Sequence, residues 1–288
     1  MIRLRPAYIA VVFLFCLSLA GMDPSPASAD NPFSGLTHRL VTEGFASERI
    51  QALYEDPGSI FETEGVALFF VHSEARLNYG QFAVPEAIER ARQYMARHHE
   101  ALTAAEAAHG VPSGVITGIL LVETRLGTYT GNLRVFSTLS TMAALSDPEV
   151  RRAFWQQIPP ERRISPDRFA AKADAKSAWA FEELKAFLRF TDREGIDPMT
   201  VTGSYAGAMG FCQFMPSNAL RLAVDGDGDG RVDLFSHADA IASVGNYLRH
   251  HRWRPGLTRD ERYRVILRYN YSKPYAETVL TIADRLGG

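Results

Sequence analysis

The chain contains very little cysteine: its 288 residues include only Cys16 and Cys212. Cys16 lies in an apolar N-terminal run that we expect to be removed, so a single cysteine would remain and no intramolecular disulfide could form. The folded state must then be stabilised by packing, with or without a bound metal, even in a compartment that permits disulfides.

A charge excess of either sign is also lacking. The 31 Lys and Arg and 33 Asp and Glu residues give a formal net charge of −2, which creates no global basic field that would favour nucleic acid or an anionic membrane surface. None of the eight histidines forms an H-E-x-x-H or similar ligand pair, and the adjacent His250 and His251 would diverge on a helix. These absences argue against a nucleic-acid-binding protein and a zinc peptidase.

The N-terminal segment has the organisation of a secretory signal peptide. Arg3 and Arg5 precede an apolar run over residues 7–20, and the small residues 27–29 follow. The run is short for a membrane span and is soon followed by Pro24. We predict a signal peptide over residues 1–29 and export to the periplasm or cell envelope, with an uncleaved N-terminal anchor as the alternative.

Residues 30–288 have the composition of a globular protein, with 46% hydrophobic and 22% charged residues in the whole chain. Apolar residues recur at helical spacing in several segments, whereas strand signals are few. We expect helices over residues 85–109, from about 112 to 127, 179–191, 238–250 and 275–286. Prolines and charges predict a surface loop over residues 156–172.

Glu123 is the most informative carboxylate. In a helix that starts near Ser113 it follows Ile119 by four residues and Ile116 by seven, so it should lie on their apolar side and be partly buried. Burial raises the pKa of a carboxyl group, and an acid that stays protonated near neutral pH can protonate a glycosidic oxygen. The alternative is a structural glutamate that pairs with an arginine or faces solvent.

Small residues dominate the segment 203–210. Its three glycines and two alanines would let the backbone approach a bulky ligand closely. Ser204, Tyr205 and the following Gln213 supply hydroxyl and amide groups suited to sugar hydroxyls and N-acetyl groups. No histidine or aspartate motif accompanies Ser204, so we do not interpret it as a nucleophile. The alternative is a segment that only packs helices tightly.

Alternating aspartates and glycines over residues 225–230 match the opening of an EF-hand loop. The oxygen ligands that this spacing predicts are Asp225, Asp227, Asp229 and the backbone carbonyl of Arg231. Three aspartates so close together would repel one another without a cation, which predicts calcium. Position 12 is Ser236 instead of glutamate, and the nearest later carboxylate is Asp239, so the loop is longer or weaker than the standard one. The alternative is a solvated Asp-Gly turn.

Aromatic rings and an amide gather in residues 268–275, before the last predicted helix. The side chains of interest are Tyr269, Asn270 and Tyr275. Tyrosine rings can stack on sugar faces and keep a hydroxyl group for hydrogen bonding. A loop whose tyrosines only pack the C-terminal helix is an equally good interpretation of this segment alone.

Taken together, these segments resemble the lytic murein transglycosylase B family, glycoside hydrolase family 103. The resemblance rests on Gly110-Val111-Pro112, Val122-Glu123-Thr124-Arg125, residues 204–217, the aspartate loop and Tyr269-Asn270, in this order and spacing. It covers almost all of the chain after the predicted signal peptide.

The resemblance implies a mainly α, goose-type lysozyme-like core over residues 111–288, a helical N-terminal region over residues 30–110, and a calcium loop over residues 225–239. It also implies an enzyme that cleaves the β-1,4 bond between N-acetylmuramic acid and N-acetylglucosamine and leaves a 1,6-anhydromuramoyl end. Glu123 would protonate the leaving oxygen and then accept the proton of the muramoyl C6 hydroxyl. Peptidoglycan strands are the implied binding partner, and other cell-wall synthesis or degradation enzymes are further candidate partners. We expect a monomer without an organic cofactor.

The resemblance also implies roles for the remaining residues. The family's sugar-binding residues fall on Ser204, Gln213, Tyr269, Asn270 and Tyr275, which would orient the substrate and stabilise developing charge. The family's calcium loop ends on a late aspartate, which implies Asp239 as the last ligand of a structural ion.

Two alternatives remain open from the sequence. A hydrolytic muramidase would use Glu123 with an activated water, and Asp147, Glu149 or Asp192 could then contribute a second carboxylate. A noncatalytic, calcium-stabilised peptidoglycan-binding protein would not depend on Glu123.

Overall fold

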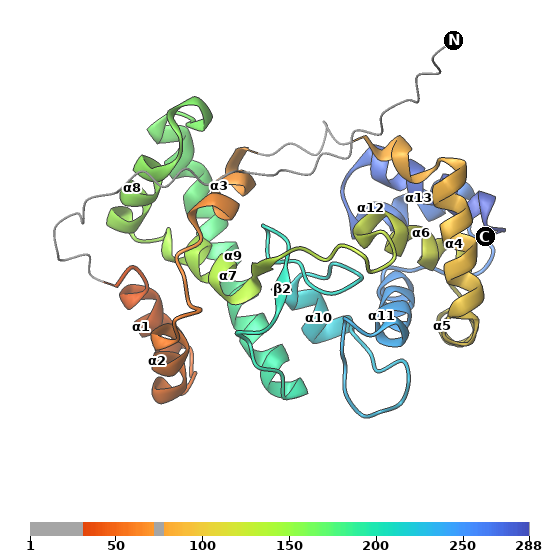
Figure 1. Ribbon diagram of the computed structural model, residues 1–288, viewed down its shortest axis with the longest axis horizontal. Helices are drawn as coiled ribbons and strands as arrows, with labels where there is room; N and C mark the ends of the chain where they lie inside the picture. The colour runs from red at the N-terminus through yellow and green to blue at the C-terminus, as the bar shows by residue number, and fades with distance from the viewer. Residues whose placement is uncertain (1–30, 72–77, 288) are drawn as a thin grey trace, which may run out of the picture. The chain divides into compact units, whose positions relative to one another are not determined.

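The computed structural model in Figure 1 describes residues 31–71 and 78–287. The predicted signal peptide lies outside the described residues. Within the described part, the chain is mainly helical, as predicted, and its few strand residues form one short two-stranded sheet.

Short helices make up the N-terminal region. They are α1 (Ser34–Thr42), α2 (Ser47–Glu55), α3 (Thr63–Val71), the 3-10 helix η2 (Tyr79–Phe82), α4 (Pro85–Arg97) and α5 (His99–His109). The single helix predicted over residues 85–109 is therefore two helices that meet at His98. The His98 ring packs 4.4 Å from the Tyr94 ring and 4.3 Å from the His237 ring, measured between centroids. This tertiary contact has no counterpart in helical periodicity, which explains why the break was missed.

The second part of the chain contains the longer helices. They are α6 (Ser113–Thr124), α7 (Val135–Ala144), α8 (Pro148–Gln157), the 3-10 helix η3 (Pro160–Arg162), α9 (Pro166–Glu194), α10 (Pro216–Leu222), α11 (His237–His250), α12 (Arg259–Tyr269) and α13 (Lys273–Arg285). Helix α9 begins at Pro166, a favourable first helical residue. The predicted surface loop is accordingly shorter, because residues 166–172 are helical.

Helix α6 lies at the centre of one group of helices. All of its residues except Ser113 and Glu123 are buried, as expected for a helix that is apolar on every side. It packs against α4, α5, α11 and α13. At Gly118 a Cβ atom would lie 3.2 Å from the carbonyl oxygen of Val279, so the absence of a side chain there lets α13 approach closely.

A second group of helices surrounds α7 and α9. Every residue of α7 is buried, and α9 contacts α7, α8 and α10. Helix α10 also contacts α11 and thus links the two groups. No single helix of the described residues is long and apolar enough to cross a membrane; only α5 and α6 together meet that description, and they are bent by 115°.

The short sheet joins two segments that are far apart in the sequence. Strand β1 (Leu133–Arg134) pairs antiparallel with β2 (Thr202–Gly203). Isolated bridges from Gly203 to Met209 and from Met209 to Phe214 continue this pairing. The segment that follows α6 is thereby placed beside the small-residue segment that we singled out in the sequence.

Candidate active site

Glu123 lies in the last turn of α6, at a helix end that is fixed in place. The chain turns through left-handed conformations at Arg125 (φ 51°), Leu126 (φ 64°) and Gly127 (φ 86°). The Thr124 hydroxyl donates to the carbonyl oxygen of Phe211 at 2.8 Å and accepts from the Gly127 N–H at 3.0 Å. The end of the helix is therefore tied to the segment that contains the small residues. Glu123 is half-buried, as the helical spacing predicted.

A buried tyrosine orients the carboxyl group of Glu123. The Tyr275 hydroxyl donates to Glu123 Oε1 at 2.6 Å, and Tyr275 is only 1% exposed. Burial and the negative charge of Glu123 raise the pKa of Tyr275 well above its ordinary value. Tyr275 consequently remains a hydrogen-bond donor to this carboxyl group at neutral pH.

A cysteine close to Glu123 is chemically inert. Cys212 is fully buried, and burial raises the pKa of its thiol to about 12. A thiol that stays protonated is neither a nucleophile nor a metal ligand. The Tyr269 hydroxyl donates to the carbonyl oxygen of Cys212 at 2.6 Å, which holds the backbone beneath the site.

Glu123 faces a cavity of about 380 Å³. The cavity brings together four of the predicted site residues, namely Glu123, Ser204, Tyr205 and Gln213. Its described lining does not include Tyr269, Asn270 or Tyr275. Of these three, the two tyrosines support the site from behind through their hydroxyl groups, and Asn270 ends α12 in an extended conformation.

The small-residue segment forms a tight turn along this cavity. The Ser204 hydroxyl accepts the N–H groups of Ala206 and Ala208 at 3.3 and 3.1 Å, and the Ser204 N–H donates to the Ala208 carbonyl at 2.9 Å. A Cβ atom at Gly203 would lie 2.1 Å from that same carbonyl oxygen. The turn thus requires glycine at this position.

Gln213 is held in a conformation that is uncommon for a residue with a side chain. Its φ is 50°, in the left-handed region. Its amide Nε2 donates to the carbonyl oxygens of Thr130 and Gly210 at 3.1 and 2.9 Å. Such outliers cluster at functional sites, where the surrounding structure maintains them.

Two carboxylates that we did not single out in the sequence also line the cavity, Glu62 and Glu64. Glu62 Oε1 accepts the Gly65 N–H at 3.0 Å at the start of α3. The only local signal is the position of these residues at a helix start, which is common and carries no functional information. Their proximity to Glu123 results from tertiary packing.

The three residues that could have contributed a second carboxylate, Asp147, Glu149 and Asp192, lie away from this cavity. Asp147 caps α8 by accepting the N–H groups of residues 149 and 150. Glu149 forms an ion pair with Arg152 at 2.9 Å, and Asp192 forms one with Arg49 at 2.5 Å. None of the three belongs to the described lining of the cavity.

The aspartate loop gathers three carboxylates. Ligand oxygens of Asp225, Asp227 and Asp229 all lie within 4.8 Å of one another. The two oxygens of Asp225 accept the N–H groups of Gly228 and Gly230 at 2.6 and 2.8 Å, and these bonds lower the pKa of Asp225. Carboxylates so close to one another fit a divalent cation, since oxygen atoms are the ligands that calcium prefers.

Asp239 is placed differently from the other predicted ligands. It is 2% exposed, and its two oxygens accept the N–H groups of Gly226 and Asp233 at 2.8 and 2.6 Å. It therefore ties both ends of the loop to the first turn of α11. Arg231 is exposed and donates its backbone N–H to Asp229 at 2.8 Å.

Residues 29–261 match the family model of the transglycosylase SLT domain. The chain belongs to this family. The chain is also 33% identical over 176 residues to membrane-bound lytic murein transglycosylase B of Escherichia coli (strain K12). That match covers 61% of this chain and 41% of the relative, so the chain spans less than half of that protein's length.

Solved structures of transglycosylases have the same fold. The soluble lytic transglycosylase SltB1 from Pseudomonas aeruginosa superposes with a TM-score of 0.71 at 25% identity, covering 88% of this chain and 97% of that chain. The Escherichia coli lytic transglycosylase Slt35, solved in complex with calcium, gives a TM-score of 0.65 at 23% identity over 89% of this chain and 92% of that one. The predicted mainly α fold and the resemblance to lytic murein transglycosylases are confirmed.

Gly203→Ala tests the tight turn of this transglycosylase domain. The added methyl group would meet a backbone oxygen that cannot move without opening the turn, so we expect a loss of about 1–3 kcal/mol in the free energy of unfolding. Gly35→Ala is the matched control, because nothing lies within 4 Å of a Cβ atom there, and it should be neutral or stabilise helix α1 by up to about 1 kcal/mol. Chemical denaturation measures both changes, and equal effects of the two substitutions would contradict the prediction.

Proposed function

We propose that this protein is a lytic transglycosylase that cleaves the β-1,4 bond between N-acetylmuramic acid and N-acetylglucosamine in peptidoglycan, with Glu123 as acid and then base. The observation that carries the proposal is a half-buried carboxyl group, oriented by the Tyr275 hydroxyl at 2.6 Å, facing a cavity with hydroxyl and amide groups. Its place of action would be the cell envelope, where peptidoglycan strands are the substrate.

In the proposed reaction Glu123 donates its proton to the glycosidic oxygen while the bond from this oxygen to the muramoyl C1 breaks. The resulting carboxylate then accepts the proton of the muramoyl C6 hydroxyl as O6 bonds to C1. The acid is regenerated, no water is consumed, and the product carries a 1,6-anhydro ring. The Tyr275 hydroxyl would keep one carboxyl oxygen oriented through both steps.

The remaining residues would bind the sugars. Ser204, Tyr205 and Gln213 line the cavity and would contact sugar hydroxyl and N-acetyl groups. Tyr129 also lines it and is 69% exposed, so its ring is available to stack on a sugar face. Tyr269 would act from behind the site, where it holds the Cys212 backbone. Asn270, the next residue, would help to orient the reacting sugar.

A hydrolytic muramidase is the second candidate, because Glu62 and Glu64 provide further carboxylates in the same cavity. One of them would activate a water molecule opposite Glu123, as the second carboxylate of a glycosidase does. The two reactions differ in their products, since hydrolysis leaves reducing muramic acid ends.

Digestion of purified sacculi with the wild type and with Glu123→Gln tests both candidates. We expect the wild type to release muropeptides with 1,6-anhydro ends, identified by mass spectrometry, and Glu123→Gln to lose about 10²–10⁴-fold in rate because the amide is no acid. Glu55→Gln, which changes an exposed glutamate on α2, is the control and should retain full activity.

Predominantly reducing ends that disappear in Glu62→Gln or Glu64→Gln would favour the muramidase instead. Undiminished cleavage by Glu123→Gln would rule out both mechanisms. Wall binding without any cleavage by the wild type would point to the noncatalytic alternative.

Tyr275→Phe tests the positioning of Glu123. Loss of a hydrogen bond to a carboxyl group removes about 1.5–3 kcal/mol, so we expect kcat to fall at least about tenfold with little change in KM. Tyr54→Phe is the matched control, because it removes another buried hydroxyl, bonded to Ser140 Oγ at 2.9 Å, away from the cavity. The prediction fails if both variants retain the wild-type kcat.

We further propose that the aspartate loop binds Ca²⁺ through Asp225, Asp227, Asp229, the carbonyl of Arg231 and Asp239. Bound calcium would neutralise the gathered carboxylates, and Asp239 would anchor the loop to α11. The supporting observations are the spacing of the three aspartates and the calcium complex of Slt35. The ion would have a structural role, because its ligands do not line the cavity beside Glu123.

Calcium should raise the melting temperature. At a free concentration 100-fold above Kd the ion would stabilise the fold by about 2.7 kcal/mol, or about 5–10 °C for a domain of this size. The double variant Asp227→Asn/Asp229→Asn should lose this response, and a chelator should reverse it in the wild type. A melting temperature that calcium does not change would contradict the proposal.

A further inference from the structure

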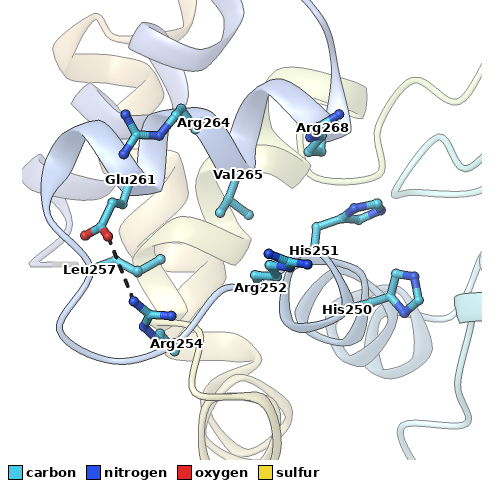
Figure 2. Close-up of a pocket in the computed structure, with 9 residues that line it drawn as sticks. All are labelled: His250, His251, Arg252, Arg254, Leu257, Glu261, Arg264, Val265 and Arg268. Carbon is cyan, nitrogen blue, oxygen red and sulfur yellow. Dashed lines mark ion pairs between the residues drawn. The ribbon is translucent and has the colours of Figure 1, made fainter.

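A second cavity, of about 590 Å³, lies between the C-terminal end of α11 and helix α12 (Figure 2). Four arginines line it, Arg252, Arg254, Arg264 and Arg268, together with two histidines and a single carboxylate. It shares no residue with the cavity beside Glu123. This concentration of positive charge contrasts with the net charge of −2 of the whole chain.

Helix α12 contributes one complete face to this basic cavity. Glu261, Arg264, Val265 and Arg268 follow the i, i+3, i+4, i+7 spacing that places side chains on one side of a helix. Figure 2 shows these residues along the helix, opposite Arg252 at the end of α11. Val265 and Leu257 are each only 8% exposed and give the cavity an apolar floor.

Most of the positive charge in the cavity is not neutralised. Arg254 lies 3.9 Å from Glu261, measured between Nη2 and Oε1, and the other three arginines have no ion pair within the described part of the chain. Glu261 also accepts the N–H and hydroxyl groups of Thr258 at 2.9 and 3.0 Å in a capping box. One carboxylate that is already bonded cannot balance four guanidinium groups.

Capping of α11 does not explain the arginines. Basic side chains often follow a helix C-terminus, where they bind the last carbonyl groups. Here the carbonyl groups of residues 247–249 accept backbone N–H groups of residues 251–253 at 2.9–3.0 Å. The helix end is thus satisfied by the backbone, and the guanidinium groups remain available for another anion.

The surroundings of His251 also indicate a positive potential. Its pKa is lowered first by burial and then by the positive charges of His250, Arg268 and Arg221. Burial is the main cause of this shift, and of the charged groups that add to it His250 and Arg268 line the basic cavity.

We propose that the basic cavity binds short acidic peptides. Carboxylates match the planar fork of an arginine in bidentate pairs. The volume falls within the range of about 300–1,000 Å³ of pockets that enclose small organic ligands, which suits several residues of a peptide better than a single inorganic anion. The apolar floor formed by Leu257 and Val265 would contact the aliphatic atoms between the carboxylates.

Binding of an acidic peptide does not depend on the proposed function, but the identity of the natural peptide does. Peptide stems of peptidoglycan carry free carboxylates, so the basic cavity would hold a stem while the cavity beside Glu123 acts on a glycan strand. Because the two cavities share no residue, peptide binding and glycan cleavage can be measured separately.

Titration calorimetry of the full chain with acetyl-Ala-Glu-Ala-Glu tests the proposal. We expect saturable binding that weakens as ionic strength rises, and no binding of the uncharged acetyl-Ala-Gln-Ala-Gln amide. This comparison uses the wild-type protein alone, so it does not depend on the folding of any variant. Equal binding of the two peptides, or binding of neither, would overturn the proposal.

Variants locate the binding site. Arg264→Gln/Arg268→Gln should weaken binding at least about tenfold, because it removes charge-assisted hydrogen bonds. Arg90→Gln/Arg168→Gln makes the same change of charge at two exposed helical arginines outside the cavity and should bind as the wild type does. Glu123→Gln should also bind normally. Unchanged affinity of the first double variant would show that the peptide binds elsewhere.

Two further probes separate other anions from peptides. If inorganic phosphate displaces the acidic peptide at lower concentrations than the peptide itself requires, the cavity is a phosphate site and the proposal is wrong. It is also wrong if the protein sediments with phosphatidylglycerol vesicles but binds no peptide. Peptide binding by a protein that releases no anhydro ends from sacculi would contradict the proposed function and leave this inference intact.

Discussion

The attachment of the end of α6 is the constraint on which the rest of the site depends. Glu123 occupies the last turn of a helix that is otherwise buried, and Thr124 bonds that turn to the Phe211 carbonyl. Tyr275, 152 positions later in the sequence, bonds to the carboxyl group itself. The bond from Tyr275 forms only if α13 packs closely against α6 at Gly118, so the orientation of one carboxyl group depends on the packing of two helices.

Polar side chains around the cavity are positioned by backbone geometry more than by one another. In the turn at Gly203, the Ala208 carbonyl group accepts the Ser204 N–H and leaves no space for a side chain at Gly203. Gln213 has a left-handed conformation, and its side-chain amide donates to two backbone carbonyl groups. Such preorganisation means that the groups meant for a substrate need not rearrange when it binds. It also explains why small residues dominate this segment, since side chains would occupy the space that the backbone uses.

Opposite charges are separated within the protein. The cavity beside Glu123 also contains Glu62 and Glu64, whereas the cavity beside α12 contains four arginines. Each cavity therefore carries a local excess of charge of its own sign. The small net charge of the chain is an average over these regions and conceals both.

Local sequence patterns were sufficient to predict part of the fold and part of the candidate site. The apolar spacing in α6 predicted a partly buried Glu123, because helical periodicity determines which residues share a face. The alternation of aspartate and glycine predicted the gathering of Asp225, Asp227 and Asp229. The extent of α9 and the break at His98 were missed, since the first depends on a start signal within a polar segment and the second on a ring contact with α11.

Tertiary structure decided which side chains meet. Tyr275 was expected to face a sugar, but its placement behind Glu123 follows from the way α13 packs on α6. Glu62 and Glu64 enter the cavity because the start of α3 packs against β1, where a Cβ atom at Gly65 would lie 2.3 Å from the Leu133 side chain, although they are about sixty positions away from Glu123. The sequence by itself determined several of the helices and the candidate acid, because periodicity and residue chemistry are local properties. The partners of that acid, and the basic cavity, were decided by contacts between distant segments, which no local pattern encodes.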